Sequence, residues 1–533
     1  MASAADRAAG DAPGGGPDAP PSDPGPGRPG HASGRGRAAV AAVSVALVAL
    51  PFLAVTFPPV ADLPQHVAQV RLLGEALADP GSPYRVQWLT PYSLVYAVFG
   101  LAWTFAGPVA AGRYGMLAVA ALWAAAVHLL AWRRRRPAAA AALASLLVFN
   151  QSLYWGFAPF LLGWPAFVAW FLLTRRAAPP PGRRLREAFL FAGGALLLYV
   201  SHALWLAAGV AWLAVDAAIG RRPARELAPR IAGVVPAAAL AAVWFGELSG
   251  TSFATPPLWV DPLRRLRPEW LVEAAFGGLR GGLETLGLLA VLGWLLAALL
   301  GHRRRLRDAI DPSLAALAVT FLAAALLAPD KFTNTIEFNT RWMPPALAAA
   351  LLAAPPLRLR PAAARGIAVA LLAGWTLVTA TVWRRIERVE LAGLAPALAA
   401  LPPAPRVLGL DYVRTSRWLD HQPYLQTFAW AQAIHGGTLN FSFADFPPSL
   451  VVYSPPRRAP WSGGLEWYPQ RLRDGDLAHF NHMLVRADAA LHARIAGDPA
   501  TEPATTAGDW RLYRLHAREA TAGRDGPGGA GPD

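Results

Sequence analysis

An aspartate and a histidine four residues apart open a long polar segment after the first apolar run, in the order Asp62-Leu63-Pro64-Gln65-His66. On a helix, residues at this spacing share a face, so His66 could orient the Asp62 carboxylate, bind substrate or complete a metal site. The carboxylate of Asp62 could take a proton from a hydroxyl group as a general base. Asp62 also precedes an apolar-periodic stretch, where aspartate commonly caps a helix. For His66 the plain alternative is an interfacial histidine facing solvent, and two ligands alone are weak evidence for a metal.

A second group of candidates lies in the loop from Asp330 to Arg341. This loop holds the only lysine of the chain, Lys331, and two of its five asparagines, although a composition rich in Ala, Arg, Gly and Pro disfavours both residue types. Arg341 could hold a phosphate through two parallel hydrogen bonds, and Lys331 could add a point charge. Glu337 lies between them as a further candidate for contact with a substrate. The alternative is ordinary anchoring of helix ends among lipid headgroups.

The remaining candidates sit at the ends of apolar segments, where polar residues are costly and therefore suggest function. Asn150, Tyr154 and Trp155 follow the third segment, and His202 separates the fifth from the sixth. The first three could line a sugar site by hydrogen bonding and stacking, although aromatic belts at a membrane interface are equally expected. His202 could equally cap a short turn between two helices.

The elements that position these residues are membrane helices. The chain of 533 residues is 54% hydrophobic and 16% charged, with a mean hydropathy of +0.32, whereas a soluble domain carries about 25% charged residues. Its apolar runs of roughly 16 to 23 residues are long enough to cross a hydrocarbon core of about 30 Å, which predicts an all-α polytopic membrane protein. The net charge of +15 resides in short Arg blocks between these runs. Such blocks mark topology and do not indicate nucleic-acid binding. Because the chain has no cysteine, disulfides and thiolate sites are excluded.

The Arg blocks determine the predicted topology, because positive residues favour the cytoplasmic side. Residues 91–106 are apolar enough to cross, but a crossing there would place the Arg133 to Arg136 block outside. We therefore expect residues 91–106 to form a helix in the outer interface and the chain to cross about eleven times. The expected crossings are 38–58, 109–132, 138–152, 158–174, 187–201, 203–219, 230–248, 283–300, 313–328, 342–355 and 366–383. One cluster, Arg384 to Arg388, dissents, and an even count would move it inside together with the C-terminal domain.

Four regions follow from this pattern. Residues 1–37 are expected to be a disordered cytoplasmic tail, residues 38–388 a transmembrane domain with a long first outer loop at 59–108, and residues 517–533 a disordered tail. Residues 389–516 are expected to form a small soluble α/β domain on the outer face. Its expected strands are 406–411, 449–453, 483–486 and 510–515, with a helix at 424–434.

This arrangement resembles the GT-C superfamily of membrane glycosyltransferases, which includes protein mannosyltransferases, the aminoarabinose transferase and the oligosaccharyltransferase catalytic subunit. The resemblance is architectural and covers most of the chain. It rests on the acidic residue that opens the first outer loop, the interfacial helix near Pro91, the short second outer loop at 149–156, the late loop ending in Arg341 and the outer C-terminal domain. Many relatives carry acidic pairs in the first and second loops, whereas here the first loop has the single acid Asp62 and the second has none. The cofactor therefore stays unknown: a divalent metal is possible, but no second acidic motif supports it.

The resemblance implies a plasma-membrane enzyme with a cytoplasmic N-terminus that transfers a sugar from a polyprenyl-phosphate donor at the outer face. The inverting reaction needs a carboxylate base and groups that hold the departing lipid phosphate. The implied partners are the lipid-linked donor, membrane lipid and a glycan, lipid or protein acceptor. Two alternatives remain: a lipid or polysaccharide transporter, although no clear internal repeat is seen, and a catalytically silent membrane protein of the same architecture.

Overall fold

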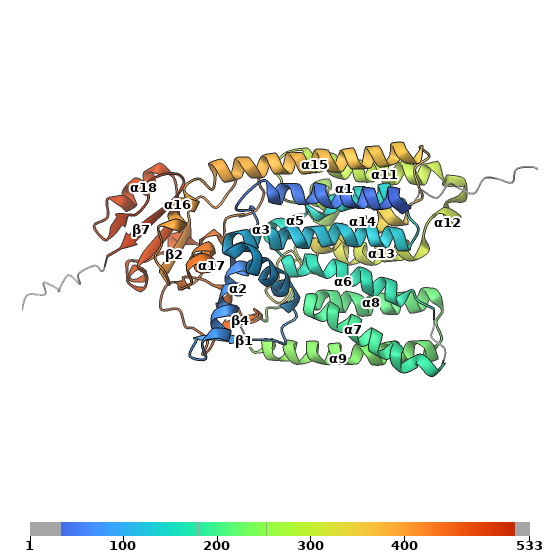
Figure 1. The fold of residues 1–533 in the computed structure, drawn as a ribbon, viewed down its shortest axis with the longest axis horizontal. Coiled ribbons are helices and arrows are strands. Elements are labelled where there is room, and N and C mark those ends of the chain that lie inside the picture. Colours follow the sequence, from blue (N-terminus) through green and yellow to red (C-terminus); the bar gives the residue numbers. More distant parts are fainter. Residues whose placement is uncertain (1–33, 178–180, 252, 517–533) are drawn as a thin grey trace, which may run out of the picture.

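The computed structural model describes residues 34–177, 181–251 and 253–516, and it is mostly helical. Long helices lie side by side in a bundle, and the C-terminal domain sits at one end of it (Figure 1). Both predicted disordered tails fall outside the described residues, except for residues 34–37. These four residues open the first helix, so the predicted boundary of the N-terminal tail was wrong there. Arg35 and Arg37 are good helix formers and extend the apolar helix by a turn.

Each of the eleven predicted crossings overlaps a helix. These helices are α1 (Gly34–Leu53), α3 (Ser93–Arg133), α4 (Ala138–Ser145), α6 (Ala158–Thr174), α7 (Arg184–Ser201), α8 (Ala203–Gly220), α9 (Ala224–Ser249), α11 (Leu283–Gly301), α13 (Pro312–Leu327), α14 (Met343–Ala353) and α15 (Pro361–Val389). Among the described residues, seven helices are long and apolar enough to cross a membrane, or up to eight if a bent pair ending in α13 counts as one span. The count of about eleven is therefore not confirmed. Several of the helices, such as α14 with 11 residues, are short.

The helix α3 is two helices joined at a break. Gly107 has φ 72° and ψ 180° inside it, and Pro108 follows directly. Glycine reaches such a φ without strain, and proline cannot donate the next helical hydrogen bond. The break lies between the predicted interfacial helix, 91–106, and the predicted crossing, 109–132. How the first half lies relative to a membrane stays a prediction.

Most of the arginine blocks lie at the bundle end away from the C-terminal domain, whereas Arg384 to Arg388 lie near that domain, at the end of α15 (Figure 1). Arg134 of the block after α3 forms an ion pair with Asp311 at 2.8 Å, and Asp311 caps α13. Arg136 donates to the carbonyl oxygens of Leu352 and Ala353 at the end of α14, at 2.7 and 2.9 Å. The α12 turn (Leu306–Ala309) also lies at this end, where α1 begins (Figure 1). The helices therefore bring together arginine blocks that are far apart in the sequence.

The C-terminal domain holds a five-stranded sheet in the order β3-β2-β5-β7-β6. Its strands are β2 (Arg406–Asp411), β3 (Thr438–Leu439), β5 (His482–Arg486), β6 (Thr501–Pro503) and β7 (Trp510–Leu515). Strand β2 is parallel to β3 and β5, whereas β7 is antiparallel to β5 and β6. The predicted strands 406–411 and 510–515 match β2 and β7, and 483–486 lies in β5. The predicted helix 424–434 is shorter than expected, a 3-10 turn at Thr427–Ala429 followed by α17 (Trp430–His435).

The predicted strand 449–453 forms, but outside this sheet. As β4 (Val451–Tyr453) it pairs antiparallel with β1 (Tyr84–Val86) of the first outer loop. Side chains of α2 (Leu63–Ala78) add to this junction: the Gln69 amide donates to the Val451 carbonyl oxygen at 3.0 Å and its oxygen accepts from the Val451 N–H at 2.8 Å. The first outer loop and the C-terminal segment are thus one structural unit at the end of the bundle.

Candidate active site

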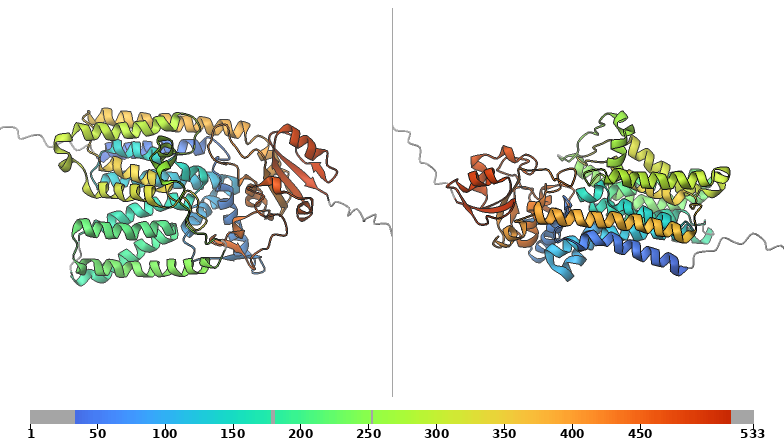
Figure 2. Two further views of the ribbon diagram at one scale, coloured as in Figure 1. Left: turned by 180° about the vertical axis from the view of Figure 1, so that it is seen from behind. Right: turned by 90° about the horizontal axis from the view of Figure 1, so that it is seen from above.

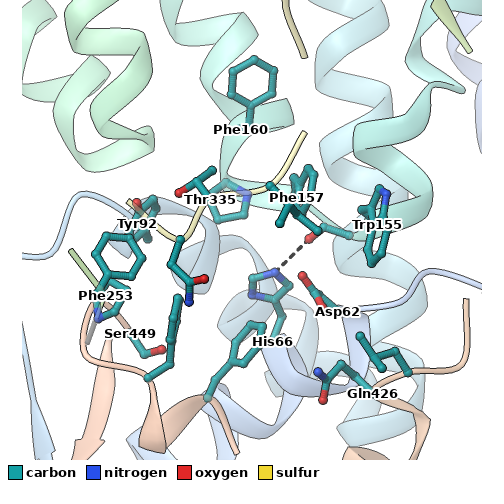
Figure 3. Close-up of a pocket in the computed structure, with 18 of the residues that line it drawn as sticks. Asp62, His66, Tyr92, Trp155, Phe157, Phe160, Phe253, Thr335, Gln426 and Ser449 are labelled. Carbon is teal, nitrogen blue, oxygen red and sulfur yellow. Dashed lines mark hydrogen bonds between the residues drawn. The ribbon is translucent and has the colours of Figure 1, made fainter. Parts of the chain in front are cut away.

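A cavity of about 580 Å³ lies at this junction between the bundle, the first outer loop and the C-terminal domain. Its walls come from α2, the start of α3, the α5–α6 turn, the loop before α14 and residues 425–468 (Figure 3). Six of the nine predicted site residues line it: Asp62, His66, Trp155, His202, Lys331 and Arg341. Segments that are far apart in the sequence therefore present these side chains to one space.

Asp62 occupies the N-cap position of α2, but its side chain makes no capping hydrogen bond. The alternative that this carboxylate serves only as a helix cap is therefore wrong. Burial raises the pKa of Asp62 to about 7, and the nearby charge of Arg341 acts in the opposite direction. A carboxylate with such a pKa is a competent base near neutral pH.

The α5–α6 turn fixes the backbone of Asp62. The N–H groups of Ala61 and Asp62 donate to the carbonyl oxygens of Tyr154 and Trp155, at 2.9 and 3.0 Å. Gly156 follows with φ +86°, and a Cβ atom there would lie 2.8 Å from the Asp62 nitrogen. Because Gly156 has no side chain, the second outer loop can approach the first.

His66 is hydrogen bonded to two partners, neither of which is Asp62. Its Nε2–H donates to the Gly156 carbonyl oxygen at 3.0 Å (Figure 3). Because Nε2 is the donor, Nδ1 accepts from the Tyr96 hydroxyl at 3.2 Å. Burial lowers the pKa of His66 to about 4, so the ring is neutral at pH 7. The alternative of a solvent-facing histidine is wrong, since this side chain is 5% exposed.

The donor set of the cavity does not fit a metal ion. Both ring nitrogens of His66 already have partners, so His66 cannot join Asp62 as a ligand without giving one up. Among the described residues, no group of three or more His, Cys, Asp or Glu side chains is placed to hold a metal.

Arg341 is a buried cation of fixed orientation, 4% exposed. Its guanidinium carbon lies 3.7 Å from the Phe157 ring centroid, and Nε and Nη2 donate to the carbonyl oxygens of Glu337 and Ile336 at 3.1 and 2.8 Å. Burial lowers the pKa of Arg341 to about 10, which leaves it charged at pH 7. Within the described part of the chain, neither Arg341 nor Lys331 has a carboxylate within 4.0 Å. Two cations without a carboxylate partner in one cavity wall suit an anionic ligand.

His202 caps a helix, as its alternative interpretation predicted, and it also lines the cavity. Its Nδ1 accepts from the Leu204 N–H at 3.1 Å and so caps α8, while the ring lies edge-on to Tyr92 with centroids 4.9 Å apart. Burial lowers the pKa of His202 well below its usual value. This side chain is therefore a neutral part of the cavity wall.

Three predicted residues do not line the cavity. Asn150 caps α5 (Gln151–Trp155), accepting from the N–H groups of Ser152 and Leu153 at 2.8 and 3.3 Å. Tyr154 turns into the bundle, where its ring fills the space beside Gly278. Glu337 supports Arg341 through its backbone carbonyl oxygen. Their expected contact with substrate is corrected to support of the structure around the cavity.

One wall of the cavity, supplied by the C-terminal domain, was not predicted from the sequence. This wall includes Gln426, Ser449, Glu466, Trp467 and Tyr468. Glu466 is buried, which raises the pKa of its carboxyl group. A carboxylate followed by two large aromatic residues in a soluble domain was the signal that could have identified this wall, because such a cluster suits a carbohydrate.

The chain is similar in structure to ArnT from Cupriavidus metallidurans, with a TM-score of 0.49 and 14% identity over 90% of this chain and 98% of that one. It is also similar to the arabinofuranosyltransferase AftD from Mycobacteria, with a TM-score of 0.44 and 15% identity over 91% of this chain. The chain spans 40% of the AftD chain. No protein-family model and no curated protein matches the chain.

Proposed function

We propose that this protein is a membrane glycosyltransferase that moves a sugar from a polyprenyl-phosphate donor to a hydroxyl acceptor at the outer membrane face. The proposal rests on one observation: Asp62 and Arg341 line the same cavity. The Asp62 carboxylate makes no capping hydrogen bond to its helix, and Arg341 is a buried cation that has no carboxylate partner among the described residues. A base for the acceptor and a cation for the leaving phosphate are the two groups that an inverting transfer needs.

In the proposed reaction, Asp62 accepts the proton of the acceptor hydroxyl as its oxygen bonds to the anomeric carbon of the sugar. The bond from that carbon to the phosphate oxygen breaks, and its electron pair leaves with the lipid phosphate. Arg341 and Lys331 stabilise the charge of the departing phosphate. Because the acceptor attacks from the face opposite the phosphate, the anomeric configuration inverts.

The remaining walls of the cavity suit binding of the donor sugar and of the acceptor. Trp155 and Phe157 lie beside Asp62 on the bundle side (Figure 3), and aromatic faces pack against the apolar faces of sugar rings. From the C-terminal domain, Glu466, Trp467 and Tyr468 offer a carboxylate for acceptor hydroxyls and rings for stacking. We assign the donor to the bundle side and the acceptor to the side of the C-terminal domain.

The membrane placement belongs to the same proposal. Most of the arginine blocks lie at the bundle end opposite the cavity, and arginine-rich ends favour the cytoplasm. The cluster Arg384 to Arg388, at the cavity end of α15, is the exception. The cavity and the C-terminal domain then face the outside, where a polyprenyl-phosphate sugar can present its headgroup.

The test uses the purified full chain in liposomes that contain synthetic polyprenyl-phosphate sugars and a mixture of soluble glycans. The account predicts release of free polyprenyl phosphate and a glycosylated product of inverted configuration. If the donor crosses the bilayer intact and no product forms, the protein is a transporter and the proposal is wrong. If neither chemistry nor movement occurs with any donor of this class, the enzymatic assignment is also wrong.

A further inference from the structure

An apolar segment before α10 (Pro268–Ala275) projects from the side of the bundle. Five large apolar side chains are exposed within nine residues, and Leu263 and Leu266 are each 71% exposed; the full set is Leu258, Trp259, Val260, Leu263 and Leu266. In the right-hand view of Figure 2, the green part of the chain stands out from the bundle near the end that carries the C-terminal domain. A cluster of this kind marks an interaction surface.

The chemistry of this segment fits the lipid–water interface. Its tryptophan and leucines are side chains that enter the boundary between headgroups and acyl chains. Arg264 and Arg267 are exposed beside the leucines of the 3-10 turn Pro262–Leu266, where long cationic side chains can reach lipid phosphates.

Asp330 ties the segment to the cationic wall of the cavity. Its Oδ2 accepts from the Val260 N–H at 2.8 Å and from Arg265 Nη2 at 2.7 Å. Its Oδ1 accepts from the Asn339 amide at 3.1 Å, and Asn339 caps the turn that contains Arg341. The backbone of Lys331 is hydrogen bonded to that of Leu258, with an N–O distance of 2.9 Å from the Leu258 nitrogen.

We propose that residues 258–267 form a foot that seats in the outer leaflet of the membrane and thereby holds the loop 330–341 in place. The foot takes a phospholipid surface as its partner, with the apolar side chains below the headgroups and Arg264 and Arg267 among the phosphates. The proposed contact of residues 258–267 with the membrane does not depend on catalysis. Its consequence for donor binding rests on the proposed function, because that loop carries Lys331 and Arg341.

The native chain has no cysteine, so one residue at a time can be labelled in the full-length protein. Leu263→Cys and Leu266→Cys carry an environment-sensitive fluorophore in phosphatidylcholine–phosphatidylglycerol liposomes, and Arg458→Cys in the C-terminal domain is the exposed control. The foot predicts blue-shifted emission and quenching by a lipid-bound nitroxide at 263 and 266, with neither at 458. Water-like emission at both positions would overturn the proposal. Blue-shifted emission that the lipid-bound nitroxide does not quench would also overturn it, because a second protein chain would then cover these positions.

Hydrogen exchange of the same protein in lipid nanodiscs tests the link to the cavity without any substrate. Exchange in residues 330–341 should rise several-fold in Asp330→Asn and in the double variant Leu263→Ser/Leu266→Ser, while β5 stays protected. Exchange in 330–341 that matches the parent in both variants would overturn the link between foot and loop. Because no step uses a donor, a failed transferase assay would not be mistaken for a failed foot.

Discussion

The backbone nitrogen of Asp62 donates a hydrogen bond to the carbonyl oxygen of Trp155 at 3.0 Å, although the two residues lie in different outer loops. This contact, together with the bond from His66 to the Gly156 carbonyl oxygen, places the carboxylate at the cavity instead of at the helix end. The base in our account is therefore positioned by the α5–α6 turn as much as by its own helix.

Gly156→Ala is predicted to disable the enzyme while the protein still inserts. The new Cβ would lie 2.8 Å from the Asp62 nitrogen, and φ +86° is unfavourable for alanine. Strain of this kind costs about 1–3 kcal/mol, and its relief would move Asp62. The measurement is transfer rate and melting temperature in detergent. Gly246→Ala in α9, whose Cβ meets open space, is the control and should behave like the parent. Full activity in Gly156→Ala would show that the approach of the two loops is unimportant.

The pH dependence of kcat/KM should show an ascending limb. Since burial raises the pKa of Asp62 to about 7, the base is mostly protonated at pH 5.5 and mostly ionised at pH 8. We expect kcat/KM to rise with pH and level off above about 7. His66 cannot produce this limb, because its pKa lies near 4. A profile that is flat between pH 5.5 and 8 would contradict the role of Asp62.

Asp62→Asn is predicted to stabilise the protein at alkaline pH. A carboxyl group whose pKa is raised by folding contributes full stability below its unfolded value, near 3.8, and loses it as the pH rises to about 7. The loss amounts to at most about 4 kcal/mol. An uncharged amide avoids it. The melting temperature of Asp62→Asn should therefore exceed that of the parent at pH 8, and by less at pH 5. A lower melting temperature at pH 8 would indicate a structural role.

Arg341→Lys should weaken donor use although the charge is retained. Lysine can neither stack flat on Phe157 as Arg341 does nor offer two parallel donors to a phosphate. Loss of one charge-assisted hydrogen bond corresponds to a rise in donor KM of about 10- to 100-fold. The measurement is donor dependence of transfer in liposomes, with Lys331→Ala alongside to separate the effect of a point charge. A residue that only anchors the helix end would tolerate the lysine.

The topology predicts that the Arg133 to Arg136 block is cytoplasmic. Arg135 lies in the turn after α3, beside the ion pair of Arg134 with Asp311. In intact cells, a single cysteine at position 135 should resist a membrane-impermeant maleimide and react after permeabilisation. Reaction from the outside would invert the arrangement of cavity and membrane.

Local patterns in the sequence predicted the helices and strands better than they predicted which of these elements pair with one another. The strands β2 and β7 were predicted because the β-like pattern of each lies within one short run of the sequence. The run 449–453 also gave a strand, but its partner β1 lies in the first outer loop, and no local pattern reports such a contact. The break at Gly107 lies at the boundary that the Arg blocks predicted between residues 91–106 and 109–132, and its cause is the local pair Gly107-Pro108.

The site was predictable where an unusual residue sits at the end of an apolar run, as with Asp62 and Lys331. The sequence could not show which of Tyr154 and Trp155 lines the cavity. Neighbours on a short helix face different sides, and here Trp155 lines the cavity while Tyr154 packs on Gly278. Glu466 was missed since it reaches the cavity only through the fold of the C-terminal domain.

The most direct test of the account is the rate at which purified Asp62→Asn cleaves a polyprenyl-phosphate sugar that the parent uses with a soluble acceptor. Asp79→Asn, which alters an exposed aspartate at the other end of α2, is the matched control. We expect a loss of about 10²- to 10⁴-fold for Asp62→Asn, the usual cost of removing a general base, with parental activity in Asp79→Asn. Parental activity in Asp62→Asn would show that this carboxylate is not the base.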